Sequence, residues 1–103
     1  MNQPPVVRVN AYPRRGRAPL RVSFSSRGSY DPDGEIVSYF WDFGDGTTSY
    51  QANPRHTYSL PPGIDKKVYY AQLTVTDNRG ATAKSRRIRI TVYRRWGFFI
   101  FAL

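Results

Sequence analysis

The chain contains no cysteine among its 103 residues, which excludes a disulfide scaffold, a cysteine-ligated zinc site and a thiol nucleophile. It has one histidine and seven carboxylates, so hydrolytic and metal-redox chemistry have few candidate groups. The longest apolar run, residues 96–103, is far shorter than the roughly 20 residues of a membrane-spanning helix. Residues 1–5 lack the basic start and apolar stretch of a signal peptide. These absences favour a binding or structural module over an enzyme.

The chain is instead rich in basic and aromatic residues. Sixteen Lys and Arg against seven Asp and Glu give a formal net charge of +9. Aromatic residues make up 16% of the chain, which argues against disorder. The length corresponds to one domain with one core.

Apolar and polar residues alternate with a period of two through most of the chain, and no window shows the periodicity of a helix. The pattern predicts strands over residues 6–9, 20–25, 36–43, 69–76 and 88–92, and a basic loop over residues 14–17. Strands of this length separated by turns predict an all-β sandwich. The core is expected to contain Leu20, Val22, Phe24, Trp41, Phe43, Leu73, Val75, Ile88 and Ile90.

Five motifs follow one another along the chain: Ala18-Pro19-Leu20, Ser29-x-Asp31-Pro32-Asp33-Gly34, Tyr39-x-Trp41-Asp42-Phe43-Gly44-Asp45-Gly46-Thr47, Asn53-Pro54-x-His56-x-Tyr58 and Tyr69-x-Ala71-x-Leu73-Thr74-Val75-Thr76-Asp77-x-x-Gly80. In this order they resemble the PKD (polycystic kidney disease) domain family, over about residues 6–92. The resemblance implies an immunoglobulin-like antiparallel β-sandwich of about seven strands with no disulfide. It also implies a non-catalytic spacer, or a protein- or carbohydrate-contacting module of cell surfaces and secreted enzymes.

The sequence divides into an N-terminal lead (1–5), a PKD-like sandwich (6–93) and a basic, then apolar, C-terminal tail (94–103). The segment 59–68 is longer than the family pattern. An exposed tail of this composition would aggregate. We therefore expect it either to fold back on its own sandwich or to dock onto a neighbouring subunit, a sheet edge or a membrane interface, unless it is a cloning or truncation artefact. Its docking residues are Trp96, Phe98, Phe99, Ile100, Phe101 and Leu103, flanked by Arg94 and Arg95.

Oxygen-bearing side chains gather in the turns at strand ends. If the sandwich brings these turns together, they could supply the six to eight oxygens that calcium prefers, and some PKD-like domains bind calcium there. The alternative is that the same side chains cap turns through local hydrogen bonds. The candidate calcium ligands are Asn10, Asp31, Asp33, Asp42 and Asp77.

No set of residues resembles a catalytic dyad or triad, so no catalytic residue is predicted. His56, the single histidine, is expected to make a structural hydrogen bond near Tyr58. Trp41 is expected to fill the space between the sheets.

The last predicted strand and its exit carry Arg87, Arg89, Arg94 and Arg95, interleaved with Tyr93 and Trp96. This basic face has four interpretations: a solvated outer surface, a site for an acidic protein, a nucleic-acid site, or a contact with an anionic membrane. Of these, a solvated surface ranks first, an acidic protein second and nucleic acid third.

The leading functional hypothesis is a non-enzymatic assembly or adhesion module that contacts neighbouring subunits, as in a virion or surface filament. The alternative is an accessory PKD domain of a secreted or cell-surface protein that contacts carbohydrate or matrix. A second alternative is a basic protein that contacts nucleic acid. The expected location is extracellular, at the cell surface or in a virion, and calcium is the one expected cofactor, if there is any.

Overall fold

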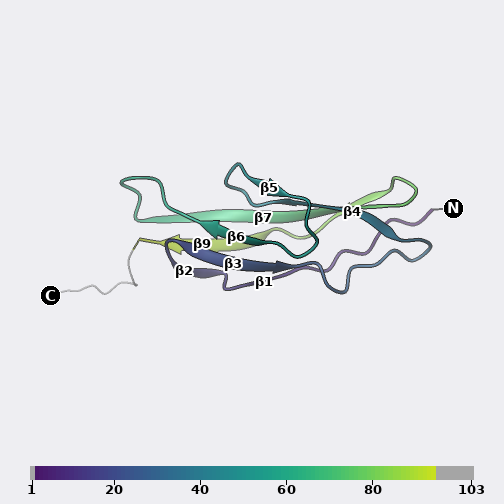
Figure 1. The fold of residues 1–103 in the computed structure, drawn as a ribbon, viewed down its shortest axis with the longest axis horizontal. Coiled ribbons are helices and arrows are strands. Elements are labelled where there is room, and N and C mark those ends of the chain that lie inside the picture. Colours follow the sequence, from purple (N-terminus) through teal and green to yellow (C-terminus); the bar gives the residue numbers. More distant parts are fainter. Residues whose placement is uncertain (1, 95–103) are drawn as a thin grey trace.

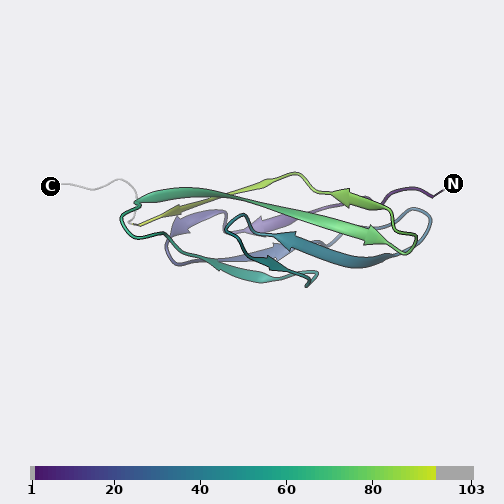
Figure 2. The same cartoon turned by 90° about the horizontal axis from the view of Figure 1, so that it is seen from above.

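The computed structural model describes residues 2–94, which form nine β-strands and no helix. The strands are β1 (Asn10–Tyr12), β2 (Arg15–Arg17), β3 (Leu20–Ser25), β4 (Ile36–Asp42), β5 (Thr48–Ser49), β6 (Arg55–Tyr58), β7 (Lys66–Asp77), β8 (Thr82–Lys84) and β9 (Ile88–Tyr93). They pack as an elongated sandwich of two sheets (Figures 1 and 2). No helix in this part of the chain is long and apolar enough to cross a membrane. The all-β prediction is confirmed.

The smaller sheet has the strand order β1-β3-β6, and the larger sheet has the order β2-β9-β7-β4-β5. β7 is the longest strand, with 12 residues. It pairs with β4 along one edge, and with β9 and then β8 along the other. The expected hairpin turn at residues 77–80 joins β7 to β8 (Figure 1). β7 therefore connects the two ends of the sandwich.

The core lies between the two sheets, and all nine residues assigned to it by alternation are buried. Trp41 is fully buried, and its indole Nε1–H donates to the carbonyl of Ala52 at 3.2 Å. Phe24 packs against Trp41 with ring centroids 5.0 Å apart. The Phe43–Thr47 turn needs Gly44, because a Cβ there would lie 2.2 Å from the carbonyl oxygen of Tyr70.

Two parts of the predicted strand pattern were wrong. Residues 6–9 are not a strand: Val6 forms one isolated bridge with Tyr30, and β1 starts only at Asn10. The expected basic loop is in fact β2, which pairs with β9 in parallel, so the sandwich is not wholly antiparallel. Both errors have one cause, because these short edge segments depend on backbone pairing with distant partners and not on apolar alternation.

The connection between β8 and β9 contains one extra residue. Lys84 faces Thr74 and Ile88 faces Ala71, so the three residues 85–87 lie opposite only two residues of β7. Such a bulge resets the inside–outside alternation of a strand. As a result Ser85 and Ile88 are both buried, while the adjacent Arg86 and Arg87 are both exposed.

The expanded segment 59–68 forms the start of β7 and, before it, a loop that is fixed by contacts with Arg94. Its last three residues lengthen β7. Arg94 holds the loop, since its guanidinium donates to the carbonyls of Ile64 at 2.9 Å and Pro61 at 2.8 Å and lies 3.6 Å from the carboxylate of Asp65. The guanidinium group of Arg94, a predicted docking residue, is therefore engaged in contacts within the chain. The other predicted tail residues, from Arg95 to Leu103, lie outside the described residues.

Candidate functional site

Three carboxylates meet at the end of the sandwich where β4 begins and β7 ends. Asp31 and Asp33 come from the turn that precedes β4, and Asp77 is the last residue of β7, opposite Ile36. One oxygen from each residue lies within 4.8 Å of the others. We refer to Asp31, Asp33 and Asp77 as the carboxylate cluster.

The N-terminal segment closes this cluster. The side-chain amide of Asn2 donates to Asp77 Oδ2 at 3.2 Å, and the backbone N–H of Gln3 donates to Asp33 Oδ2 at 2.8 Å. Pro5 is buried. Residues 2–5 are therefore part of the sandwich end and not a separate lead.

Several oxygens in and beside the cluster are buried with no hydrogen-bond partner among residues 2–94. They are Asp31 Oδ1 and Oδ2, Asp33 Oδ1 and Asn2 Oδ1. Buried polar atoms in proteins are nearly always paired, so four unpaired oxygens at one place need an explanation. Gly34 allows this close packing, since a Cβ there would lie 2.3 Å from Asn78 Oδ1 and 2.8 Å from Asp31 Oδ2.

The pKa values of two carboxyl groups in the cluster shift in opposite directions. Burial of the Asp31 carboxyl, and then the charges of Asp77 and Asp33, raise the pKa of Asp31 above its ordinary value. Burial also acts on Asp77, but hydrogen bonds from the backbone N–H groups of Arg79 and Ala81 outweigh it and hold the pKa of Asp77 below its ordinary value. Asp77 is thus an anion stabilised by hydrogen bonds, whereas the ionised form of Asp31 is destabilised by burial and then by the neighbouring charges.

These residues fit a hard divalent cation. Carboxylate and amide oxygens are the ligands of calcium, and the unpaired lone pairs are available to one ion. A cation would also offset the repulsion that raises the pKa of Asp31. The residues that could hold it are Asp31, Asp33, Asp77 and Asn2.

Two of the five predicted calcium ligands are not in the cluster. Asp42 pairs with Gln72, five residues along β7 from Asp77, which is about 16 Å at the usual rise of a strand. Its Oδ1 accepts the backbone N–H of Gly44 at 3.0 Å. Asn10 lies on β1 opposite Ser25, and its Oδ1 accepts the N–H of Ala11. Both side chains cap their local backbone.

Two amide residues of this region were missed from the sequence. Asn2 contacts Asp77 across 75 positions of the chain, so no local pattern could indicate it. The Oδ1 of Asn78 accepts the N–H of Glu35 and fixes the turn above the cluster. The Asp-Asn-Arg-Gly turn after β7 was visible in the sequence, but only as a turn.

His56 has the structural role expected of it. Its Nε2 lies 2.7 Å from Asp45 Oδ2, and its ring stacks on Phe43 with centroids 4.1 Å apart. Tyr58 meets the ring edge-on, and its hydroxyl donates to the carbonyl of Phe43. Burial, and then the charge of Asp45, raise the pKa of the Tyr58 hydroxyl. The contact between His56 and Asp45 joins β6 to the turn after β4.

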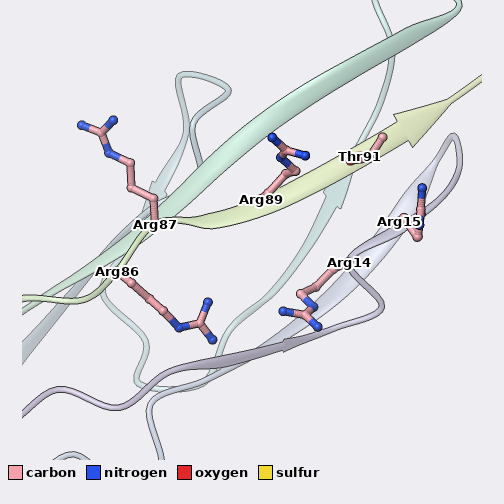
Figure 3. Close-up of a pocket in the computed structure, with 6 residues that line it drawn as sticks. All are labelled: Arg14, Arg15, Arg86, Arg87, Arg89 and Thr91. Atoms are coloured by element: carbon pink, nitrogen blue, oxygen red, sulfur yellow. The ribbon is translucent and has the colours of Figure 1, made fainter.

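The predicted basic residues Arg87 and Arg89 lie on the outer face of the larger sheet. With Arg14, Arg15, Arg86 and Thr91 they line a surface hollow of about 420 Å³ (Figure 3). We call it the arginine hollow. The sequence indicated its β9 side but not Arg14 and Arg15, which reach it because β2 pairs with β9.

Comparisons with known proteins agree with this fold. A family model for the PKD domain matches residues 2–92. The chain is 43% identical to collagenase ColQ1 of Bacillus cereus over 84 residues, which is 82% of this chain and 8% of the collagenase. The PKD1 domain of Vibrio anguillarum Epp has a TM-score of 0.67 and 36% identity, covering 87% of this chain and 96% of that domain.

A further solved structure, described as carbohydrate-binding modules from the beta-sandwich super family, has a TM-score of 0.74 and 33% identity, covering 90% of this chain and 36% of that one. The chain therefore spans less than a tenth of the collagenase that it matches, but nearly all of an isolated PKD domain. The five sequence motifs, the sandwich and the family match lead to one conclusion: the chain belongs to the PKD domain family.

Proposed function

We propose that this chain acts as a non-catalytic accessory module that brings a larger protein into contact with extracellular matrix or carbohydrate. The observation that carries the proposal is its likeness to a collagenase over 82% of this chain but only 8% of the collagenase. Such a relation is expected of a module that accompanies a catalytic domain. The likeness to a structure described by its carbohydrate-binding modules supports the same class of partner.

The side chains of the sandwich support a non-catalytic role. The one histidine is stacked in a structural cluster, and its Nε2 faces Asp45 and Thr47 in the turn after β4. A nucleophile, a base and an orienting group in hydrogen-bond reach would be needed for covalent catalysis. In such a site the nucleophile and the orienting carboxylate contact opposite ring nitrogens, whereas here the Thr47 hydroxyl and the Asp45 carboxylate both contact Nε2 of His56.

The comparisons favour the accessory-domain alternative over the leading hypothesis from the sequence. The relatives reported above include a collagenase and a structure described by its carbohydrate-binding modules, and they lend no support to a subunit of a virion or filament. The proposed location is accordingly outside the cell.

We further propose that the carboxylate cluster binds calcium. The support is the four unpaired buried oxygens, the raised pKa of Asp31 and the fit of the donor set to a hard cation. Calcium bound there would offset two of the three carboxylate charges. The ion would join the N-terminal segment, through Asn2, to the β7–β8 turn.

The proposed function is tested by binding of the 103-residue chain to insoluble collagen and to insoluble polysaccharides, measured by co-sedimentation with calcium and with chelator. Retention on either class of matrix above a bovine albumin control is expected. Failure to bind any of these matrices in both buffers would contradict the accessory role.

A further inference from the structure

The arginine hollow concentrates positive charge on one face of the larger sheet. Five of its six lining residues are arginines, and the sixth is Thr91. Figure 3 shows Arg86 and Arg14 extending toward one another across the space between β9 and the segment before β2, while Arg87 is directed away from that space. Arginines that served only as a solvated surface would not need to converge on one space from two segments of the chain.

The backbone that carries these arginines is held in place. Ser85, which precedes Arg86, is buried, and its N–H donates to the carbonyl of Leu73 at 2.8 Å. Its hydroxyl accepts from the N–H of Leu73, and its carbonyl accepts from the side chain of Gln72. On the other side of the hollow, the N–H of Thr91 donates to the carbonyl of Arg14 at 2.9 Å. A charged surface on fixed backbone loses less entropy when it binds.

These arginines do not take part in the ion pairs found within residues 2–94. The carboxylates in those pairs are Asp45, Asp33 and Asp65, and their partners are His56, Arg79 and Arg94. Arg15 donates to the hydroxyl of Tyr93 at 3.0 Å, which keeps its charge. The hollow therefore has a surplus of positive charge, and guanidinium groups suit planar or tetrahedral oxyanions.

The bulge at residues 85–87 links this hollow to a second one. Arg87 lines both the arginine hollow and a hollow of about 270 Å³ that also includes Tyr70, Gln72 and Asp42. Tyr70 is 47% exposed and lies directly opposite Arg89 in the β7–β9 pair. We call this second space the tyrosine hollow.

The residues that line the tyrosine hollow indicate which class of polyanion fits this face best. An exposed aromatic ring provides an apolar face for a sugar ring, and a carboxylate and an amide provide partners for hydroxyl groups. Asp42 would repel any anionic group placed in the tyrosine hollow, whereas the hydroxyl of an uncharged part of a sugar ring can donate to it. The combination of anion-binding arginines and a hydroxyl-binding hollow favours a polysaccharide over DNA or an acidic protein.

We infer that the arginine hollow and the tyrosine hollow together bind an acidic polysaccharide, with its sulfate or carboxylate groups on the arginines and a sugar ring on Tyr70. This inference rests on the proposed function and names the class of carbohydrate. The cationic face meets the anionic groups, and the tyrosine hollow sets the specificity for sugar.

The experiment is calorimetric titration of the full chain with a heparin hexasaccharide at near-physiological salt. The double variant Arg87→Gln/Arg89→Gln should weaken binding about tenfold or more, because both guanidinium groups would contact anionic groups. The matched control is Arg21→Gln/Arg55→Gln, which removes the same charge from exposed positions on the smaller sheet. We expect the control to weaken binding by less than about threefold, as long-range attraction alone would.

Sugar recognition is tested separately with Tyr70→Ala, which should weaken hexasaccharide binding about fivefold or more without changing the binding of polyglutamate. Equal losses in the two double variants would show that only net charge matters and would overturn the inference. Tighter binding of duplex DNA or polyglutamate than of heparin would overturn it in favour of nucleic acid or an acidic protein. If heparin fails to bind while collagen or a neutral polysaccharide is retained, this inference is wrong and the proposed function stands.

Discussion

The carboxylate cluster and the arginine hollow carry opposite charge, and their charged groups differ in exposure to solvent. The cluster is made of buried oxygens that face one another at the sandwich end, and one of them is held by backbone N–H groups. The hollow is made of exposed guanidinium groups on the outer face of a sheet. The cluster is therefore coupled to the stability of the fold, and the hollow is not.

The contrast follows from the cost of desolvating charge. Like charges that lie close together and out of water repel strongly, so the cluster stores unfavourable energy until a cation or proton relieves it. Exposed arginines remain hydrated and screened, so they can gather at little cost to folding. Substitutions in the two regions should thus differ in what they change.

The largest effect is expected from Asp77→Ala in the cluster. Its carboxylate accepts the N–H groups of Arg79 and Ala81, and alanine would leave both donors of the β7–β8 turn unsatisfied. We expect the melting temperature to fall by more than about 10 °C, measured by circular dichroism without calcium. A change of only a few degrees would show that the turn does not depend on this carboxylate.

The next effect is stabilisation by calcium. A ligand that binds only the folded state at 100 times its Kd stabilises it by about 2.7 kcal/mol. In calcium-free buffer, ionisation of Asp31, whose pKa is raised, destabilises the folded state. This loss of stability is absent in acid and grows as the pH rises through that pKa. The lowered pKa of Asp77 adds to the free energy of unfolding. This stabilisation is present above the ordinary pKa of an aspartate and is lost as the pH falls through the lowered pKa.

Calcium should therefore raise the melting temperature fully at neutral pH and lose its effect in acid, where protons compete for Asp31. Calorimetry at pH 7 and pH 3.5 with calcium, magnesium or chelator checks this. An identical melting temperature with calcium and with chelator at pH 7 would leave only the turn-capping interpretation of the cluster.

A smaller loss is expected from Gly34→Ala. The added methyl would overlap Asn78 Oδ1 and Asp31 Oδ2, both of which are constrained. Overpacking of this kind costs about 1–3 kcal/mol. Denaturant unfolding of this variant should be compared with Gly63→Ala, whose added Cβ meets no atom within 4 Å although its φ is +80°. Gly34 has no positive φ, so its loss would report crowding, whereas any loss in the Gly63 variant would report backbone strain alone. An unchanged free energy of unfolding for Gly34→Ala would show that the cluster accommodates the added methyl.

Asp31→Asn should change stability with the opposite sign. It removes the carboxylate whose pKa is raised, and with it the repulsion from Asp33 and Asp77. At neutral pH without calcium the melting temperature should rise, by less than about 5 °C. The same variant should lose the calcium response. A fall in melting temperature without calcium would show that Asp31 stabilises the fold as an anion.

The smallest effect on stability is expected in the arginine hollow. Arg87→Gln/Arg89→Gln alters exposed side chains and should shift the melting temperature by less than about 4 °C. Its response to calcium should equal that of the parent chain. A large loss of stability, or a lost calcium response, would show that the two regions are coupled and would break the comparison.

Much of the fold could be predicted from local sequence, and less of the sites. β3, β4 and the later half of β7 were visible because one buried face imposes a period of two. β2 and β8 were not, since three-residue strands are defined by pairing and not by pattern. Asp31, Asp33 and Asp77 were identified as calcium candidates, but Asn10 and Asp42 were grouped with them because the sequence cannot tell which strand ends share one end of the sandwich.

The sequence by itself determined the class of fold, the inward faces and the family, because burial of one side of a strand and the demands of tight turns act on neighbouring residues. Only the tertiary structure decided that Asn2 meets Asp77, that β2 brings Arg14 and Arg15 to β9, and that Arg87, at the bulge, lines both the arginine hollow and the tyrosine hollow. These outcomes depend on pairing across long separations in the chain, where the cost of closing a loop is offset only once the whole sandwich has formed.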